Sequence, residues 1–182
     1  MARVLMVVAQ QDYRDEELDE TRQELERAGH ACVVASQLVG PCKGVHGGRA
    51  TADLALDDAD ARAFDATVFI GGPGARALFT SPAAHRVARQ AHESGKVLGA
   101  ICVAPTILAN AGLLTRRRAT VFHTEIETLE ARGVLFTGDG VTVDNNIVTA
   151  SGPREARSFG RTVARLLATR ARMETAQLHP TR

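Results

Sequence analysis

One of the three cysteines, Cys102, stands where a chain could present a nucleophile to a substrate. It follows the small pair Gly99-Ala100 and precedes Ala104-Pro105, where proline suits the first turn of a helix. Strand, cysteine and helix N-terminus are therefore predicted to be contiguous, as in a nucleophile elbow. Because a helix N-terminus favours the thiolate, we expect a lowered pKa for this thiol. The same pattern also allows a buried structural cysteine.

Two other side chains could exchange protons with such a thiol. Glu17 lies in an acidic run over residues 15–20, and such runs are usually the solvated first turn of a helix. His123 follows a short strand-like stretch and could equally be a hydrogen-bonded core or surface residue. The pattern alone favours the structural interpretation of both residues.

A glycine-rich loop, Gly71-Gly72-Pro73-Gly74, follows another apolar run. It fits a loose dinucleotide fingerprint, but it follows an internal strand and no acidic residue ends the next one, so nucleotide binding is poorly supported. Close backbone approach is the better role. We expect an N–H group of this loop to face an oxyanion beside Cys102.

These residues are far apart in the sequence, so the fold must bring them together. Apolar runs predict buried strands at residues 4–9, 31–35, 66–70 and 97–101, and helical patterns lie between them at 15–28, 82–94 and 105–111. Alternating strands and helices predict an α/β fold with a doubly wound, mostly parallel sheet. Loops that leave the carboxyl ends of such strands share one edge, where the candidate residues should meet.

The remaining segments elaborate this sheet. Glycines and Pro41 between residues 35 and 59 predict a hairpin-like excursion with one strand over 49–56. Residues 141–144 and 147–149 flank an Asn145-Asn146 turn, and a helix over 154–172 closes the chain. With 182 residues and no repeat or linker, we expect one domain over residues 1–173 and a loose tail over 174–182.

The composition limits which classes of partner the protein could bind and which cellular compartment suits it. The net charge of +1 gives no basic surface for nucleic acid or acidic membrane, so small molecules or proteins are the expected partners. The first residues fit neither a signal peptide nor a membrane span. An odd number of cysteines without a CxxC pair argues against a metal site and for thiols in a reducing compartment. A cytoplasmic protein is therefore predicted.

The sequence around the cysteine resembles a known family. Ala100-Ile101-Cys102, Ala104-Pro105 and residues 108–114 are similar to the signature of the PfpI/ThiJ family, and the resemblance continues through residues 14–18, 44–48, 70–74 and 149–153. That family includes intracellular proteases, glyoxalase-III-like enzymes, protein deglycases and chaperone-like stress proteins. The resemblance implies a flavodoxin-like sandwich, no cofactor, and assembly into homo-dimers or homo-hexamers.

The resemblance also assigns roles. It makes Cys102 the reactive cysteine and Glu17 the acid that hydrogen-bonds its sulfur, and it gives the oxyanion to the N–H groups of Gly72 and Val103. His123 falls near a histidine that some branches place beside the cysteine. The matching stretches also contain three candidate substrate-binding residues, Arg14, Gly71 and Pro73.

Three functions fit these residues. The first is an enzyme that acts on small reactive carbonyls or their protein adducts, or as a weak hydrolase, with Cys102 as nucleophile. The second is a redox-sensing or chaperone-like stress protein whose cysteine is oxidised without turnover. The third is an intracellular peptidase, which is disfavoured because Val103 stands where the proteases of the family carry a histidine.

Overall fold

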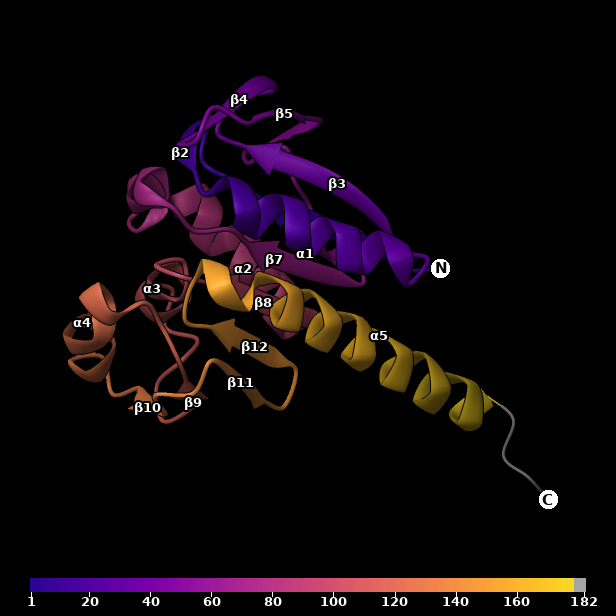
Figure 1. Cartoon of the computed structure of the whole chain (residues 1–182). Coiled ribbons are helices and arrows are strands. Elements are labelled where there is room, and N and C mark those ends of the chain that lie inside the picture. Colours follow the sequence, from indigo (N-terminus) through magenta and orange to yellow (C-terminus); the bar gives the residue numbers. More distant parts are fainter. Residues whose placement is uncertain (179–182) are drawn as a thin grey trace.

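A seven-stranded sheet forms the centre of the computed structural model, which describes residues 1–178 (Figure 1). The strand order is β11-β12-β8-β7-β1-β3-β6, and all neighbours run parallel except β11 and β12. Along the chain the strands are β1 (Arg3–Val7), β3 (Ala31–Ser36), β6 (Leu54–Ala55), β7 (Ala66–Phe69), β8 (Val97–Ile101), β11 (Val141–Asp144) and β12 (Ile147–Ala150). The predicted α/β, mostly parallel, flavodoxin-like sheet is confirmed.

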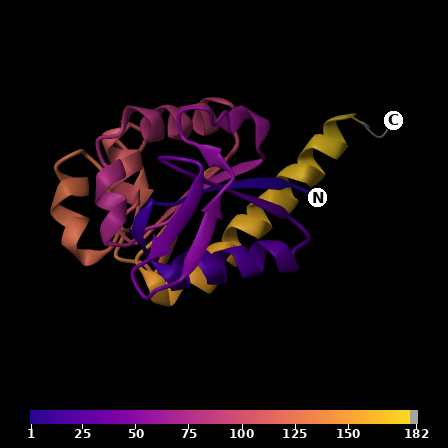
Figure 2. The ribbon, with the colours of Figure 1, turned by 90° about the horizontal axis from the view of Figure 1, so that it is seen from above.

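Helices cover both faces of the sheet. Helices α1 (Asp15–Arg27) and α5 (Ala156–Leu178) lie side by side on one face, and α2 (Pro82–Glu93) and α3 (Pro105–Asn110) lie on the other (Figures 1 and 2). Side chains of β1 alternate between the two layers: Val4 and Met6 join the core under α1 and α5, whereas Leu5 and Val7 join the core under α2. Because both faces are covered, each strand is an almost continuous apolar run.

The excursion between β3 and β7 differs in detail from the prediction. A hairpin is present, but the single strand expected over residues 49–56 is wrong. It is divided into β5 (Arg49–Ala52), which pairs with β4 (Gly40–Gly44), and β6, which pairs with β3 in the central sheet. Strand β2 (Gln11–Tyr13) joins the other edge of β4 and brings this small sheet against the start of α1.

A second small unit lies between β8 and β11. It contains the parallel pair β9 (Arg118–Ala119) and β10 (Leu135–Phe136) and the short helix α4 (Ile126–Glu130). Short 3-10 helices precede several elements, over Ala61–Ala63, Pro73–Leu78, His123–Glu125 and Pro153–Glu155. None of these short elements follows from the hydrophobic pattern.

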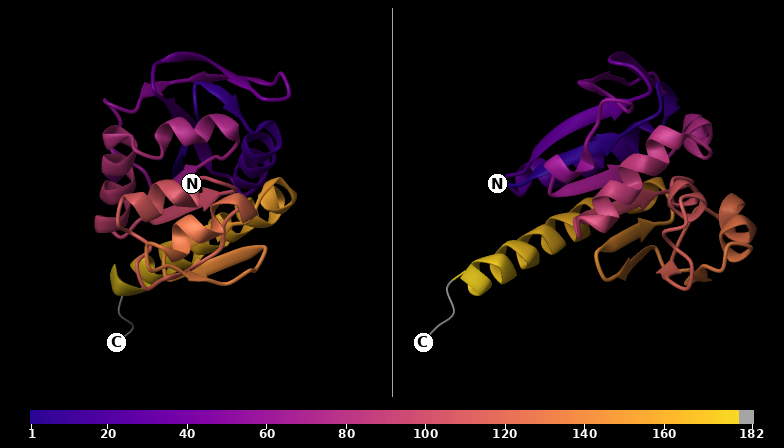
Figure 3. Two further views of the ribbon diagram at one scale, coloured as in Figure 1. Left: turned by 90° about the vertical axis from the view of Figure 1, so that its left-hand side faces the viewer. Right: turned by 180° about the vertical axis from the view of Figure 1, so that it is seen from behind.

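The last helix is longer than the sequence indicated. Helix α5 runs to Leu178, past the expected end at residue 172, and its last turns project beyond the sheet (Figures 1 and 3). Residues 174–178 of the predicted loose tail are therefore helical, and residues 179–182 lie outside the described residues. Within residues 1–178, no helix combines the length and the apolarity that crossing a bilayer requires.

Candidate active site

Cys102 occupies a sharp turn directly after β8. Its φ of 63° lies in the left-handed region, which residues other than glycine rarely adopt. Two hydrogen bonds hold this backbone: the Cys102 N–H donates to the Ala150 carbonyl at 2.9 Å, and the Phe122 N–H donates to the Cys102 carbonyl at 2.8 Å. The predicted elbow between strand and helix is present, and only 6% of the residue is exposed.

Glu17 lies beneath this cysteine and is completely buried. Its Oε2 accepts a hydrogen bond from the Gly71 N–H at 2.8 Å, and the carboxyl group lies beside the Cys102 side chain, where its charge acts on the thiol. Among the described residues, Oε1 has no hydrogen-bond partner. The solvated-surface interpretation of Glu17 is therefore wrong, because this position of the acidic run points into the protein and lies beside Cys102.

The pKa values of the Glu17 carboxyl and the Cys102 thiol are both raised. Burial raises the pKa of Glu17 to about 7, against the opposing hydrogen bonds from Cys102 and Gly71. Burial, followed by the charge and the hydrogen bond of Glu17, raises the pKa of the Cys102 thiol to about 12, although the Gly72 and Val103 N–H groups lower it. The expected low thiol pKa is thus wrong, since burial beside an acid outweighs the helix N-terminus. Near pH 7 the Glu17 carboxyl is therefore close to half ionised while the thiol keeps its proton, so a transfer of that proton to Glu17 would have to accompany the attack of sulfur on a substrate.

Glycines allow the second loop to approach this pair. A Cβ on Gly71 would lie 2.6 Å from the Cys102 Cβ and 2.7 Å from Glu17 Oε2, so no side chain fits there. Gly72 has a φ of 104°, and a Cβ on it would overlap the Arg14 backbone nitrogen. Since the Arg14 N–H donates to the Gly71 carbonyl at 3.0 Å, the loop is fixed against the start of α1. The predicted close backbone approach is confirmed.

A cavity of about 310 Å³ opens above the sulfur. The structure brings together Arg14, Gly72, Pro73, Cys102 and Val103 of the predicted residues on its wall. Gly71 and Glu17 lie behind this wall and support it. Four wall residues were not predicted, namely Arg76, Phe122, Thr124 and Pro153. They come from the irregular turns after β7, β9 and β12, whose course the hydrophobic pattern does not indicate.

Comparison with known proteins places this arrangement in a family. A model of the DJ-1/PfpI family matches residues 2–166. The chain belongs to the DJ-1/PfpI family.

Relatives in the DJ-1/PfpI family align over nearly the whole chain. A deglycase of Pyrococcus abyssi is 32% identical over 165 residues, which are 91% of this chain and 99% of that protein. A glutathione-independent glyoxalase of Caenorhabditis elegans is 28% identical over 163 residues, 90% of this chain and 87% of the relative. The crystal structure of a ThiJ/PfpI domain protein from Brachyspira murdochii superposes with a TM-score of 0.90 at 30% identity, covering 92% of this chain and 96% of the other.

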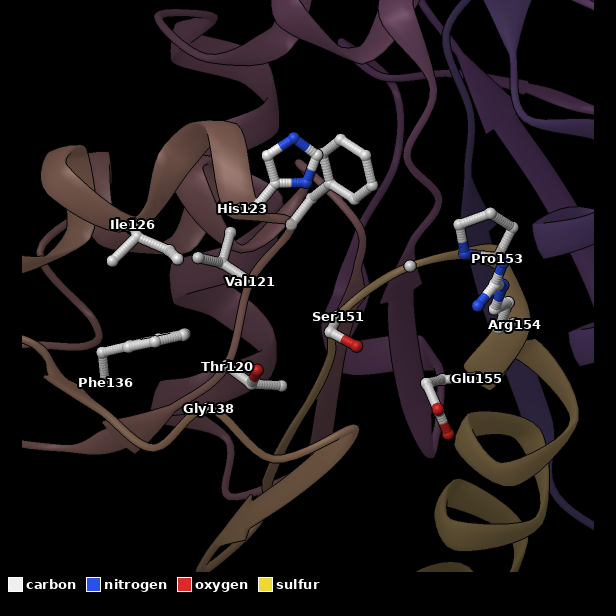
Figure 4. A pocket seen from close by; sticks show the side chains of 12 residues that line it. Thr120, Val121, His123, Ile126, Phe136, Gly138, Ser151, Pro153, Arg154 and Glu155 are labelled. Carbon is white, nitrogen blue, oxygen red and sulfur yellow. The ribbon is translucent and has the colours of Figure 1, made fainter.

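The structure does not place His123 on the wall of the cysteine cavity of this DJ-1/PfpI protein. The histidine is exposed and lines a neighbouring pocket of about 580 Å³, where its ring centroid is 4.3 Å from that of Phe122 (Figure 4). This pocket is larger, but the cysteine does not line it, so we assign the chemistry to the smaller cavity. The next residue, Thr124, lines the cysteine cavity instead. A role for His123 as a base stays a prediction.

The cysteines and acids form no metal site within the described residues. No cluster of three or more His, Cys, Asp or Glu side chains there could hold an ion, and all three cysteines are free thiols. Cys42 is buried and donates to the Gly40 carbonyl, and Cys32 is half-buried with a thiol pKa raised to about 11 by burial. The groups at hand for chemistry are the thiol and the backbone N–H groups on the cavity wall and the Glu17 carboxyl behind it.

Proposed function

We propose that this protein is an enzyme that adds the Cys102 sulfur to small reactive carbonyl compounds or to their protein adducts. The observation that carries the proposal is the buried Glu17 carboxyl, with a pKa of about 7, which lies beside the Cys102 thiol below a small cavity. A general base works best when its pKa lies near the working pH. The similarity to a deglycase and to a glutathione-independent glyoxalase supports the same chemistry.

The first step follows from the geometry. Sulfur attacks the carbonyl carbon, a C–S bond forms, and the thiol proton passes to the ionised Glu17 carboxylate. The electron pair of the C=O bond moves to oxygen, which the backbone N–H groups of Gly72 and Val103 can stabilise, since both residues line the cavity with Cys102 and both favour the thiolate. Glu17 then returns the proton to that oxygen, which leaves a neutral hemithioacetal.

Turnover of methylglyoxal tests the proposal. We expect the wild type to consume methylglyoxal, Cys102→Ala to be inactive, and Glu17→Gln to lose roughly a hundredfold in kcat/KM, as is typical when acid–base catalysis is lost. Glu20→Gln is the matched control, because Glu20 lies on the same helix and faces Arg157 at 3.5 Å. Consumption that survives in Cys102→Ala would show that the cysteine is not the nucleophile.

A redox role is the second candidate, and the same hydrogen bonds favour it. Gly72, Val103 and a protonated Glu17 could hold the oxygens of a sulfinic acid as well as a carbonyl oxygen. If the protein turns over no carbonyl but dilute hydrogen peroxide converts Cys102 alone to sulfinic acid, this second function replaces the first. Mass spectrometry of the peptide that contains Cys102 distinguishes the two.

Peptidase activity should be weak or absent. Val103 replaces the adjacent histidine, and no histidine among the described residues lines the small cavity. Casein or a fluorogenic peptide should therefore stay uncleaved at enzyme concentrations that consume methylglyoxal. Cleavage by the pure wild type that disappears in Cys102→Ala would contradict this.

A further inference from the structure

Besides the Cys102 thiol, the wall of the cysteine cavity carries two ionisable side chains, and both are arginines. They are Arg14, which precedes α1, and Arg76, which lies in the turn after β7. In the part of the chain that the structure describes, no carboxylate lines this cavity. The Gly72 and Val103 N–H groups at its floor are also hydrogen-bond donors. The cavity thus offers mostly donors and positive charge.

The acids that pair with the two arginines lie outside the wall. Arg14 Nε is 2.8 Å from Glu16 Oε2, and Arg76 Nη2 is 2.6 Å from Oε1 of the buried Glu125. These pairs fix the guanidinium groups without using all of their donors, because each group carries five N–H bonds. Within residues 1–178, Nη1 of neither arginine donates a hydrogen bond, so both can bind an incoming acceptor.

We propose that this cavity selects small carbonyl compounds that also carry a carboxylate. The inference rests on the proposed function, and it specifies the substrate class for the same site. The carbonyl oxygen would meet the Gly72 and Val103 N–H groups, and the carboxylate would meet Arg14 and Arg76 by charge-assisted hydrogen bonds. A cavity of about 310 Å³ suits a molecule of a few carbon atoms. Neutral carbonyls would use the first contact only.

Two alkylating reagents of similar size test the selection without any need for turnover. Iodoacetate carries a carboxylate and iodoacetamide is neutral, and with either one sulfur displaces iodide, so that a C–S bond forms and the C–I bond breaks. The rate constants for Cys102 are measured by mass spectrometry, and their ratio, iodoacetate over iodoacetamide, is compared with that of 2-mercaptoethanol. Because both reagents react with the same thiol, its pKa cancels in the ratio.

We expect the ratio for Cys102 to exceed that of 2-mercaptoethanol by roughly threefold to tenfold, which corresponds to the net contribution of one typical hydrogen bond. Arg14→Gln should lower the ratio toward that of 2-mercaptoethanol, because one of the two guanidinium groups on the wall is lost. Arg76→Gln alone would leave Glu125 buried without its partner, so the double change Arg76→Gln with Glu125→Gln is the safer variant. Arg154→Gln is the control, since Arg154 lines the neighbouring pocket instead.

The outcomes separate the two proposals. A ratio equal to that of 2-mercaptoethanol, or an equal fall in Arg154→Gln, overturns the selection of carboxylates, whatever methylglyoxal shows. A raised ratio that depends on Arg14 and Arg76 supports it. If methylglyoxal is not consumed while the ratio stays raised, the proposed turnover fails but the anion preference of the cavity stands.

Discussion

Glu17 is an acid that the fold keeps out of water at a cost to stability. The carboxyl is completely buried, and its pKa of about 7 compares with a usual value near 4.5. A carboxyl whose pKa is higher in the folded state than in the unfolded one binds its proton more tightly when folded. Stabilisation from this group is therefore present at acidic pH and is lost as the pH rises through the folded pKa.

The pH dependence of stability should reveal this. Between pH 5 and pH 8 the free energy of unfolding of the wild type should fall relative to Glu17→Gln, by an amount on the order of 2–3 kcal/mol. Urea denaturation of both proteins at the two pH values measures the difference. Other carboxyls, such as Asp15 with its lowered pKa, act equally in both proteins and cancel. Parallel pH profiles would mean that Glu17 is ionised at acidic pH and not coupled to the thiol as described.

Cys102 should be the first thiol to react with limiting iodoacetamide at neutral pH, although its pKa is raised. It faces a cavity and has a carboxylate beside it that can accept its proton, whereas Cys42 is buried and bonded to the Gly40 carbonyl. Cys32 is the useful comparison, because burial raises its thiol pKa to about 11 without such an acceptor. Peptide mass spectrometry would contradict the assignment if Cys32 or Cys42 were labelled first.

At the scale of elements, the contact between α1 and α5 depends on a glycine. A Cβ on Gly160 of α5 would lie 2.9 Å from the Glu24 Cβ and 3.0 Å from the Thr21 carbonyl oxygen of α1. Alanine normally stabilises a helix relative to glycine by about 1 kcal/mol. Here we expect Gly160→Ala to destabilise the protein by roughly 1–3 kcal/mol, because the helices must separate.

The exposed Ser158 on the same helix provides the control. Ser158→Ala should leave the urea midpoint nearly unchanged, since its side chain meets solvent and not α1. If Gly160→Ala were as stable as Ser158→Ala, the close contact between α1 and α5 at Gly160 would be contradicted.

The long elements could be predicted and the short ones could not. Buried strands such as β1 and β8 have a continuous apolar run, and helices such as α2 end at a glycine, so local physics determines both. Strands β2, β9 and β10 contain two or three residues each, and their pairing depends on distant partners. The predicted strand over residues 49–56 was wrong for the same reason, because its two halves pair with different strands.

The site shows the same division. Cys102 and the Gly71-Gly72 loop were evident because each follows a buried strand, and a parallel sheet brings such ends to one edge. The burial of Glu17 depends on the rotation of α1 against the sheet, which one acidic run cannot indicate. Arg76 could have been suspected from its place just after the glycine loop, but its direction is fixed by the buried Glu125, far away in the sequence.

At the scale of the whole molecule, the end of α5 contributes little to the core. Among residues 156–177, Leu167 is the last buried hydrophobic residue, and residues 171–177 are exposed. A chain that ends at residue 173 should therefore keep its thermal midpoint within about 2 °C and consume methylglyoxal at the wild-type rate. Ending the chain at residue 166 should lower the midpoint clearly, because Leu167 is lost. If ending the chain at residue 173 lowered the thermal midpoint strongly, residues 174–182 would support the domain, and the predicted boundary would be wrong.

The assembly expected from the resemblance, a homo-dimer or homo-hexamer, remains a proposal. Size-exclusion chromatography with light scattering on the full chain tests it, against a mass of 19.4 kDa for one copy. A single species of that mass at micromolar concentration would contradict it.

The two backbone hydrogen bonds at Cys102 have a consequence for the timescale on which the nucleophile can move. Its N–H is tied to Ala150 in β12, and its carbonyl receives the Phe122 N–H from the segment after β9. Neither amide can exchange its hydrogen with solvent deuterium unless β8 parts from β12 or the segment after β9 moves away from Cys102. The amides of Cys102 and Phe122 should thus exchange as slowly as those of the central strands, hours behind exposed positions in the loop over residues 45–49. In this fold, the proposed nucleophile should be among the last residues to open.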